Sequence, residues 1–402
     1  MSYSYIARQP ILTRDQKVYG YELLFRDSNS NSFPNIDPNE ATSKLLLEQH
    51  LLGDIQTLCM GKQAFINFHA RTLLNDFPSF LNARTVWVEL LETVGVDAPL
   101  LEACSSTTSK GYRIALDDHD FDGQWDPVIP MINMVKVDIQ EQGLNLESKI
   151  RFFKEKGIPL LAERVETYDE FERCLELGFD YFQGFFFEKP QVVQQKSLSP
   201  NRISKLTLLS EVHKKELDLN TIRQIIEQDL SLTFSLLKLV NSALYGGRKK
   251  IENIQHALVY LGDAEIRRFV TLVVLANVSA GQPEELTIKS VTRARFMELV
   301  TVEILNEKHR SSAFLAGMLS LLDIILGVPM DDVLKQLPLS SEITKGLKSR
   351  EGVWGYLLQM TEIYERGEWD ALDKHPLKQK LNGTDIGQLY IDASQWCRLA
   401  LF

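Results

Sequence analysis

The stretch PLLAERVETYDEFERCLELGFDYFQGFFFEKP, residues 159–190, decides the fold of the first half of the chain. It contains a short apolar run, Pro159–Ala162, then an amphipathic segment, Tyr168–Leu177, and then a second apolar run, Tyr181–Phe187. Short, nearly continuous apolar runs are typical of strands in a parallel sheet that is covered on both faces. The stretch therefore predicts a strand, a helix and a second strand.

The same alternation continues toward the N-terminus. Four more runs rich in Val, Ile, Phe and Trp are strand candidates: Gln63–Phe68, Thr85–Leu91, Arg113–Leu116 and Met134–Ile139. Three segments between them are helix candidates: Ala41–Leu58, Leu100–Lys110 and Leu146–Lys156. Before these, Gln9–Leu12 and Val18–Phe25 flank a polar turn and predict a hairpin. This order of elements predicts an α/β sheet or a (β/α)8 barrel.

The pattern changes after Pro190. Residues 191–200 are polar, and from Arg202 onward apolar residues recur at helical spacing, as in Leu206, Leu209 and Val212. Few strand candidates follow. The second domain is therefore predicted to be mostly α-helical, with the boundary near residues 191–200.

Composition agrees with two globular domains. The chain has 402 residues, of which 44% are hydrophobic and 24% charged, and its formal net charge is −10. An acidic balance argues against a broad nucleic-acid surface, so we expect no direct nucleic-acid binding. The four cysteines show no zinc-type spacing, and neither residues 1–10 nor Phe269–Val278 form a membrane-length apolar segment. We expect a cytoplasmic protein that does not enter a membrane.

Polar residues end most of the predicted strands. They are Glu22, Asn67, Glu89, Asp117, Asp118, Lys136, Asp138, Glu163 and Gln183. In a (β/α)8 barrel the carboxyl ends of the strands meet at one mouth, so these side chains are expected to converge. Any one of them taken alone is explained as well by a helix cap or a surface charge. As a ring they offer hard oxygen ligands that suit Mg²⁺ or Mn²⁺, and two such ions can promote phosphodiester hydrolysis.

The first half resembles the EAL domains that hydrolyse cyclic di-GMP. Nine motifs in the family's order carry the likeness over about residues 5–190, and the resemblance implies an EAL-type (β/α)8 barrel, which is placed at 1–190. They include Gln9-Pro10-Ile11, Gly20 to Arg26, Asp117-Asp118, Lys136-Val137-Asp138, Ala162 to Thr167, and Gln183-Gly184 through Lys189-Pro190. The resemblance implies that the family's product, linear pGpG, is formed at a two-metal site that holds Mg²⁺ or Mn²⁺.

The resemblance also implies roles for individual residues. Glu22, Asn67, Glu89 and Asp117 match ligands of the first metal, and Asp118 helps to hold a second. Lys136 matches the residue that assists the attacking water, and Glu163 and Gln183 complete the catalytic set. Gln9 and Arg26 match contacts to the base and phosphate of the ligand, and Glu92 matches the glutamate that anchors the loop after Asp118.

Three departures from the family's pattern bear on activity. The signature reads Glu22-Leu23-Leu24, with Leu in place of the small Ala, and the DDFGTGYSS loop is replaced by residues 117–125. Arg164 stands where the family has Gly and places a bulky cation beside Glu163. Changes around metal ligands can cost about 10–100-fold in metal affinity or activity. These departures favour the alternative of an EAL domain that binds without turnover.

The second half resembles HDOD domains over about residues 197–345, and the helical domain is placed at 197–402. Asp229 to Leu232, Leu236 to Tyr245 and Ile254 to Gly262 carry the likeness. No His-Asp dipeptide occurs in this half, and its histidines are scattered, which predicts a non-catalytic domain. Asn241 is explained equally well as a capping or turn residue.

Two hypotheses follow. One is an enzyme, a cyclic di-GMP phosphodiesterase whose HDOD domain regulates it or binds an unknown protein partner. The other is a catalytically degenerate EAL domain that senses cyclic di-GMP or serves as a scaffold. A homodimer is compatible with both.

Overall fold

The computed structural model describes the chain in segments. In the first half these are residues 6–25, 52–91, 95–117, 123–140 and 146–188. In the second half they are residues 208–209, 212, 216–228, 233, 236–237, 240–241, 251–279, 282–335, 337, 339–381 and 383–401. The chain divides into two compact units, of which the first comprises Met1–Lys189, Ile363–Leu372 and Asp385–Ile391 and the second comprises the remainder. The predicted domain ranges, 1–190 and 197–402, stay a prediction.

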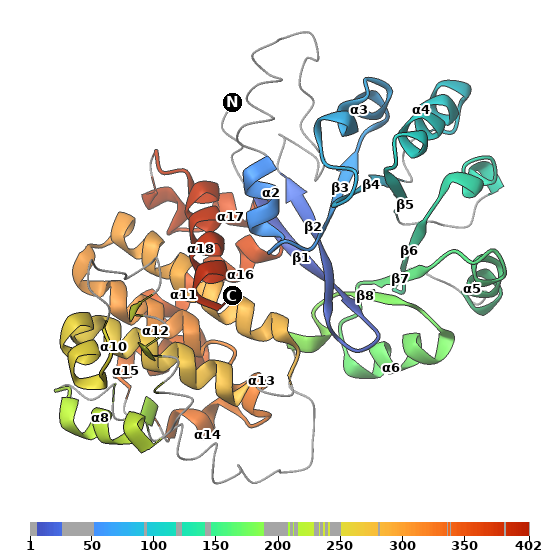
Figure 1. Ribbon diagram of the computed structural model, residues 1–402. Helices are drawn as coiled ribbons and strands as arrows, with labels where there is room; N and C mark the ends of the chain where they lie inside the picture. The colour runs from blue at the N-terminus through green and yellow to red at the C-terminus, as the bar shows by residue number, and fades with distance from the viewer. Residues whose placement is uncertain are drawn as a thin grey trace. The chain divides into compact units, whose positions relative to one another are not determined.

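The first unit is built on a closed eight-stranded barrel, which decides between the two predicted α/β folds (Figure 1). Its strands neighbour one another in chain order: β1 (Ile6–Thr13), β2 (Val18–Phe25), β3 (Gln63–Phe68), β4 (Val86–Leu90), β5 (Arg113–Leu116), β6 (Met134–Asp138), β7 (Leu160–Glu163) and β8 (Tyr181–Gln183). Strands β2 to β8 are parallel. The predicted hairpin is confirmed, and its strand β1 closes the barrel by running antiparallel to both β2 and β8.

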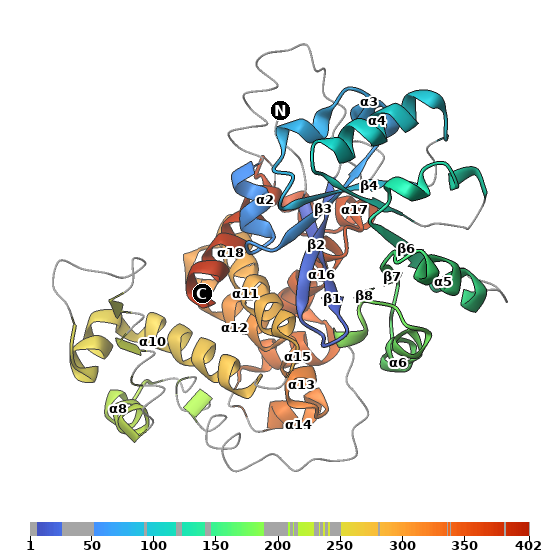
Figure 2. The ribbon, with the colours of Figure 1, turned by 45° about the vertical axis from the view of Figure 1, so that its right-hand side comes forward.

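Helices follow the parallel strands and lie on the outer side of the barrel (Figures 1 and 2). They are α2 (Leu52–Leu58), α3 (Ala70–Leu74), α4 (Ala98–Ser109), α5 (Leu146–Glu155) and α6 (Tyr168–Leu177). Helix α6 shows how local sequence sets such an element. Thr167 accepts from the Glu170 backbone N–H, and the Glu170 side chain accepts from the Thr167 N–H, which is a complete capping box. Gly178, at φ 93°, ends the helix in the left-handed conformation that glycine adopts without strain.

The predicted last strand was too long. Tyr181–Phe187 is apolar throughout, but β8 ends at Gln183 and a 3₁₀ turn, η5, occupies Phe186–Glu188. The reason is Gly184, whose φ of 146° turns the chain and whose missing Cβ would overlap the backbone of Val165. The close approach lets the Val165 N–H donate to the Gln183 carbonyl at 3.0 Å.

A layer of large side chains fills the inside of the barrel. It comprises Ile11, Phe65, Trp87, Ala115, Met134 and Leu161, with Tyr19 and Tyr181 packed against them. Phe65 and Trp87 stack with their ring centroids 5.0 Å apart. Because side chains on a strand alternate between its two faces, the residues two positions further along must also point inward. This layer is therefore the floor under whatever lies at the carboxyl ends of the strands.

The second half of the chain is helical, as predicted, and contains no strand among its described residues. The helices are α8 (Leu219–Gln228), α10 (Ile254–Val278), α11 (Glu284–Ile304), α12 (Arg310–Leu319), α13 (Leu322–Leu326), α14 (Met330–Lys335), α15 (Ser341–Ser349), α16 (Gly352–Glu365), α17 (Trp369–Lys374) and α18 (Ile386–Leu401). Helix α11 runs beside α12 (Figure 2) and is buried on almost every side. None of the described helices is both long and apolar enough to cross a bilayer.

Asn241 has a structural role in this half. Its side-chain amide donates to the Leu237 carbonyl at 2.7 Å and to the Ile251 carbonyl at 2.8 Å. Its side-chain oxygen accepts from the Ile251 N–H at 2.9 Å. The residue therefore joins the end of one helical segment to the extended backbone ahead of α10.

Candidate active site

The barrel mouth carries a polar layer directly above the apolar one. Two residues beyond the floor residues of β3 to β8 stand Asn67, Glu89, Asp117, Lys136, Glu163 and Gln183. Strand β2 adds Glu22, and β1, which runs the other way, adds Gln9 two residues before Ile11. The predicted convergence of these side chains is what the period of the strands and the closure of the barrel produce.

Lys136 is the centre of this layer, and its side chain is only 1% exposed. Its Nζ lies within ion-pair distance of four carboxylates: 2.6 Å from Asp117 Oδ1, 2.9 Å from Glu89 Oε1, 2.9 Å from Glu163 Oε1 and 3.1 Å from Glu22 Oε2. An ammonium group has three N–H donors, so it cannot satisfy four carboxylates. With all five groups ionised, the centre holds an excess of negative charge.

Amide side chains hold Glu22 in place. Asn67 Nδ2 donates to Glu22 Oε1 at 2.8 Å, and Gln183 Nε2 donates to Glu22 Oε2 at 2.6 Å. Gln183 Nε2 is also 3.0 Å from Gln9 Oε1. The Glu22 carboxylate thereby connects β2, β3 and β8, and the Gln183 amide extends the connection to β1.

The electrostatics differ from one group to the next. Burial by itself lowers the pKa of Lys136, but the four carboxylates together raise it well above its ordinary value. Burial, followed by the charge of Glu22, raises the pKa of Glu89 well above its ordinary value. The pKa of Glu22 is lowered, because Lys136 and the amide hydrogen bonds together outweigh the opposing effect of burial. Lys136 is therefore a permanent cation at neutral pH.

Several buried oxygens in the layer have no hydrogen-bond partner among the described residues. They are Asn67 Oδ1, Glu89 Oε2 and Gln183 Oε1. Unpartnered buried oxygens are costly, and oxygen donors of this kind are the ligands that Mg²⁺ and Mn²⁺ prefer. No group of three or more His, Cys, Asp or Glu in the described part of the chain is arranged as a metal site, and the Lys136 ammonium lies where the carboxylates converge. The chemistry of the donor set nevertheless fits divalent cations.

A cavity of about 440 Å³ opens above the layer. It is lined by Gln9, Glu22, Leu24, Asn67, Leu91, Asp117, Asp138, Glu163, Arg164 and Gln183. Lys136 and Glu89 are absent from the lining and lie beneath it. Ligand pockets commonly measure about 300–1,000 Å³, so this cavity is large enough for a small molecule.

Arg164 lines the same cavity as its neighbour Glu163 and also has a partner on the neighbouring strand. Its guanidinium, 51% exposed, pairs with the buried carboxylate of Asp138. Its φ of 53° lies in the left-handed region that favours glycine, and its carbonyl accepts from Gln140 Nε2 at 3.3 Å. Backbone strain of this kind concentrates at functional sites.

Not every predicted site residue can be placed. Glu22, Asn67, Glu89, Asp117, Lys136, Glu163, Gln183 and Gln9 are brought together, whereas Arg26, Glu92 and Asp118 lie outside the described residues. Asp138 was expected among the converging residues but was given no role, and its pairing with Arg164 was not predicted. The signal was present, because Asp138 follows Lys136 by two residues on the same strand and so faces the same mouth.

The sequence of this chain is similar to those of known proteins. A family model described as the HDOD domain matches residues 200–342. "Cyclic di-GMP phosphodiesterase CdgJ" of Vibrio cholerae is 36% identical over 397 residues, which cover 98% of this chain and 92% of CdgJ. "Uncharacterized protein YuxH" of Bacillus subtilis is 29% identical, with 98% of both chains covered.

Among solved structures, a standalone versatile EAL protein from Vibrio cholerae O395, in its c-di-GMP-bound form, is 22% identical. The match covers 49% of this chain and 95% of that protein, with a TM-score of 0.36. The likeness to CdgJ extends over nearly the whole of both proteins, and the HDOD model covers most of the second half. The chain belongs to the family of EAL–HDOD proteins that includes CdgJ.

Proposed function

We propose that this protein is a metal-dependent phosphodiesterase that hydrolyses cyclic di-GMP to linear pGpG. One observation carries the proposal: four carboxylates, three of them buried, surround a single ammonium at the floor of a cavity of about 440 Å³. An acidic centre of this kind is costly to bury unless it binds cations. The name of CdgJ, a relative that is 36% identical, supports the same substrate.

The residues that would hold the metal are those predicted from the sequence. Glu22, Asn67, Glu89 and Asp117 would hold a first Mg²⁺ or Mn²⁺, and Asp118 would contribute to a second. When bound, such ions supply a hydroxide nucleophile at neutral pH and stabilise charge on the phosphate.

The protein's own side chains position and balance the reaction. Lys136 keeps its proton, so it acts as a fixed positive charge beneath the carboxylates and cannot serve as a base. Glu163 lines the cavity and is placed to accept a hydrogen bond from water. Hydrolysis forms one bond between water oxygen and phosphorus and breaks one ester P–O bond. One proton leaves the water, and one reaches the departing ribose oxygen.

Arg164 is the only basic residue among the described residues that line the cavity. A planar guanidinium suits a phosphate diester, with which it forms paired hydrogen bonds. Cyclic di-GMP carries two phosphates, and the carboxylate-rich floor repels both unless cations intervene. We propose that Arg164 binds one phosphate and that Asp138 holds the guanidinium in position for it.

The alternative function is a cyclic di-GMP sensor without turnover. The pairing of Arg164 with Asp138 favours it, because it neutralises a carboxylate that faces the cavity. Under either function, the helical domain serves as a non-catalytic regulatory part that binds a partner protein or a second copy of the chain.

The test is hydrolysis of cyclic di-GMP by the purified full chain with Mg²⁺ or Mn²⁺, next to Glu22→Ala. Glu172→Gln, on the exposed face of α6, is the matched control. Metal-dependent pGpG formation that is lost in Glu22→Ala and kept in Glu172→Gln supports the enzyme. Calorimetric binding without turnover supports the sensor, and absence of both turnover and binding contradicts each of them.

A further inference from the structure

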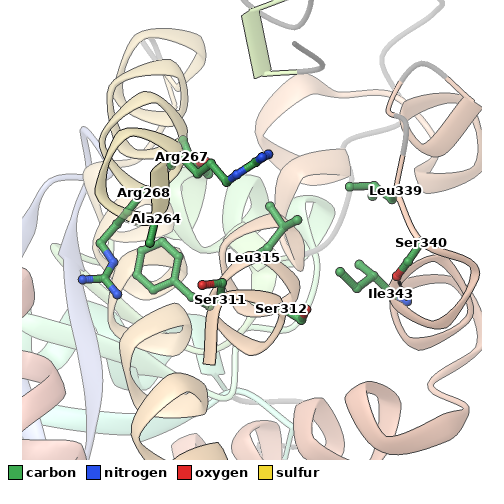
Figure 3. Close-up of a pocket in the computed structure, with 11 residues that line it drawn as sticks. Ala264, Arg267, Arg268, Ser311, Ser312, Leu315, Leu339, Ser340 and Ile343 are labelled. Carbon is green, nitrogen blue, oxygen red and sulfur yellow. Dashed lines mark hydrogen bonds between the residues drawn. The ribbon is translucent and has the colours of Figure 1, made fainter. Parts of the chain in front are cut away.

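A second cavity lies within the helical unit, apart from the barrel. It measures about 230 Å³ and opens between α10, α12 and the start of α15 (Figure 3). Its walls comprise Ala264, Arg267, Arg268, Thr271, Ser311, Ser312, Phe314, Leu315, Leu339, Ser340 and Ile343. No carboxylate occurs among these lining residues, although the chain as a whole carries a net charge of −10.

The two arginines that line this cavity have different roles. Arg267 extends from α10 across the space toward Leu339 and Ser340, whereas Arg268 turns away from it (Figure 3). The Arg267 guanidinium donates to the Val212 carbonyl, which fixes its direction. Burial lowers the pKa of Arg267, and the charge of Asp263 partly opposes this. Arg267 thus presents a partly dehydrated cation to the cavity.

Arg268 makes the opposite wall rigid. It pairs with the fully buried carboxylate of Glu298 and lies 5.0 Å above the ring of Phe314, itself a lining residue. Glu298 also accepts from Arg310 at 2.9 Å, and Arg310 directly precedes Ser311. Helices α10, α11 and α12 are therefore joined behind the cavity, so its shape is preorganised rather than formed by a ligand.

The remaining walls define what fits. Leu315, Leu339 and Ile343 supply an apolar side, and Ser311 and Ser312 supply hydroxyl groups on the turn of α12 that faces it. A volume of about 230 Å³ is below the usual range for drug-sized ligands, so the occupant must be compact. A cationic end, hydroxyl donors and an apolar side suit a small organic anion.

We propose that this cavity binds a small organic anion, a phosphate monoester or carboxylate with a compact apolar body. The anionic group lies against Arg267 and the serine hydroxyls, and the apolar body lies against Leu315 and Ile343. The site is separate from the barrel mouth and does not depend on the function proposed there.

The test measures binding of phenyl phosphate to the full chain by calorimetry and saturation-transfer NMR, with phenol as the neutral matched probe. Arg267→Gln removes the cation, and Ser311→Asp places a carboxylate at an exposed position in a lining that has none. Each variant is expected to lower the affinity for phenyl phosphate by roughly tenfold or more, which is the usual loss for a charge-assisted hydrogen bond.

Ser105→Asp, which adds the same charge to the exposed face of α4, is the control and should leave the affinity unchanged. The proposal is overturned if phenol binds as tightly as phenyl phosphate. It is equally overturned if Ser311→Asp, a variant that removes no buried contact, binds as the unaltered protein does.

Discussion

The two halves of the molecule each bury a charged centre, and the two centres are opposites. In the barrel, one ammonium, that of Lys136, faces four carboxylates, and some buried oxygens find no hydrogen-bond partner in the described part of the chain. In the helical unit, one carboxylate, that of Glu298, faces the guanidinium groups of Arg268, Arg295 and Arg310. Both Glu298 oxygens are engaged, and Glu265 and Glu307 balance two of the arginines from outside.

This difference separates a binding site from a structural cluster. We call the cluster of Glu298 with Arg268, Arg295 and Arg310 the brace. The barrel centre has more acceptors than donors and opens into a cavity, so it gains by taking up cations. In the helical centre each Glu298 oxygen has a donor, and the pairs connect α10, α11 and α12, so this carboxylate holds helices together. Removing a carboxylate should therefore have opposite consequences for stability in the two halves.

The largest expected effect is on stability, at Glu298. Glu298→Ala leaves three arginines facing a buried gap, and loss of one partner from a buried ion pair costs about 3–5 kcal/mol. Urea denaturation of the full chain should show this loss. Glu307→Ala removes an exposed carboxylate from the same network and should change stability by less than about 0.5 kcal/mol. If Glu298→Ala and Glu307→Ala lowered the unfolding free energy equally, the buried Glu298 would be no more important for stability than an exposed carboxylate.

Lys136→Met should lower the unfolding free energy by a similar amount, but added divalent cations should reverse the loss. Without the ammonium, the four carboxylates, three of them buried, repel one another, and about 3–5 kcal/mol of stability is lost. Mg²⁺ or Mn²⁺ can replace the missing cation, so the added ion should raise the melting temperature of Lys136→Met more than that of the unaltered protein. Lys110→Met, at an exposed lysine, is the control. A variant that the ions fail to stabilise would contradict a cation-binding role for these carboxylates.

Glu89→Gln should separate activity from stability. The substitution keeps the shape of a fully buried side chain, and it removes one charge from a group of like charges. Turnover should fall by about 10²–10³-fold, the usual loss for one preorganised electrostatic group, while the unfolding free energy stays the same or rises. Steady-state kinetics and urea denaturation on one preparation give both results. A matching loss of stability would make Glu89 a structural residue.

Arg164→Gln tests the proposed phosphate contact. The loss of one charge-assisted contact predicts affinity for cyclic di-GMP about 10–100-fold weaker, with kcat nearly unchanged. Arg164→Lys keeps the charge but not the planar donor pair, so its affinity should lie between the two. Arg, Gln and Lys all have a Cβ, so the backbone strain at φ 53° is the same in the unaltered protein and in both variants. Unchanged KM and Kd in both variants would leave Arg164 as a partner of Asp138 alone.

Sequence predicted the barrel well because each strand is buried on both sides and so forms a continuous apolar run. It predicted the hairpin of β1 and β2 and a barrel, but not that β1 would close the barrel by pairing antiparallel with β8. Closure depends on pairing across about 170 residues, which local patterns do not contain. The end of β8 was misplaced because the apolar run continues past Gly184, whereas the backbone turns there.

For the site, the order of polar residues at the strand ends was enough to predict their convergence. It was not enough to predict that Lys136 would touch all four carboxylates, because that depends on side-chain length inside a closed ring. The helical centre was missed altogether. Arg268, Arg295, Glu298 and Arg310 occur on three helices among other charged residues, and helical spacing does not distinguish a buried charge from a solvated one.

The smallest expected effect concerns Asn241, which lies in the segment that resembles HDOD domains. Its side chain bonds both backbone groups of Ile251, and Asn241→Ala leaves them without these partners at a cost of about 1–2 kcal/mol. Asn241→Asp keeps the acceptor for the Ile251 N–H and loses the donor, so it should cost less. If both variants keep their stability but lose binding of a partner protein, Asn241 is a recognition residue. Asn241 would then belong to an interaction surface, and the structural role of buried polar groups in this half would rest on the cluster around Glu298.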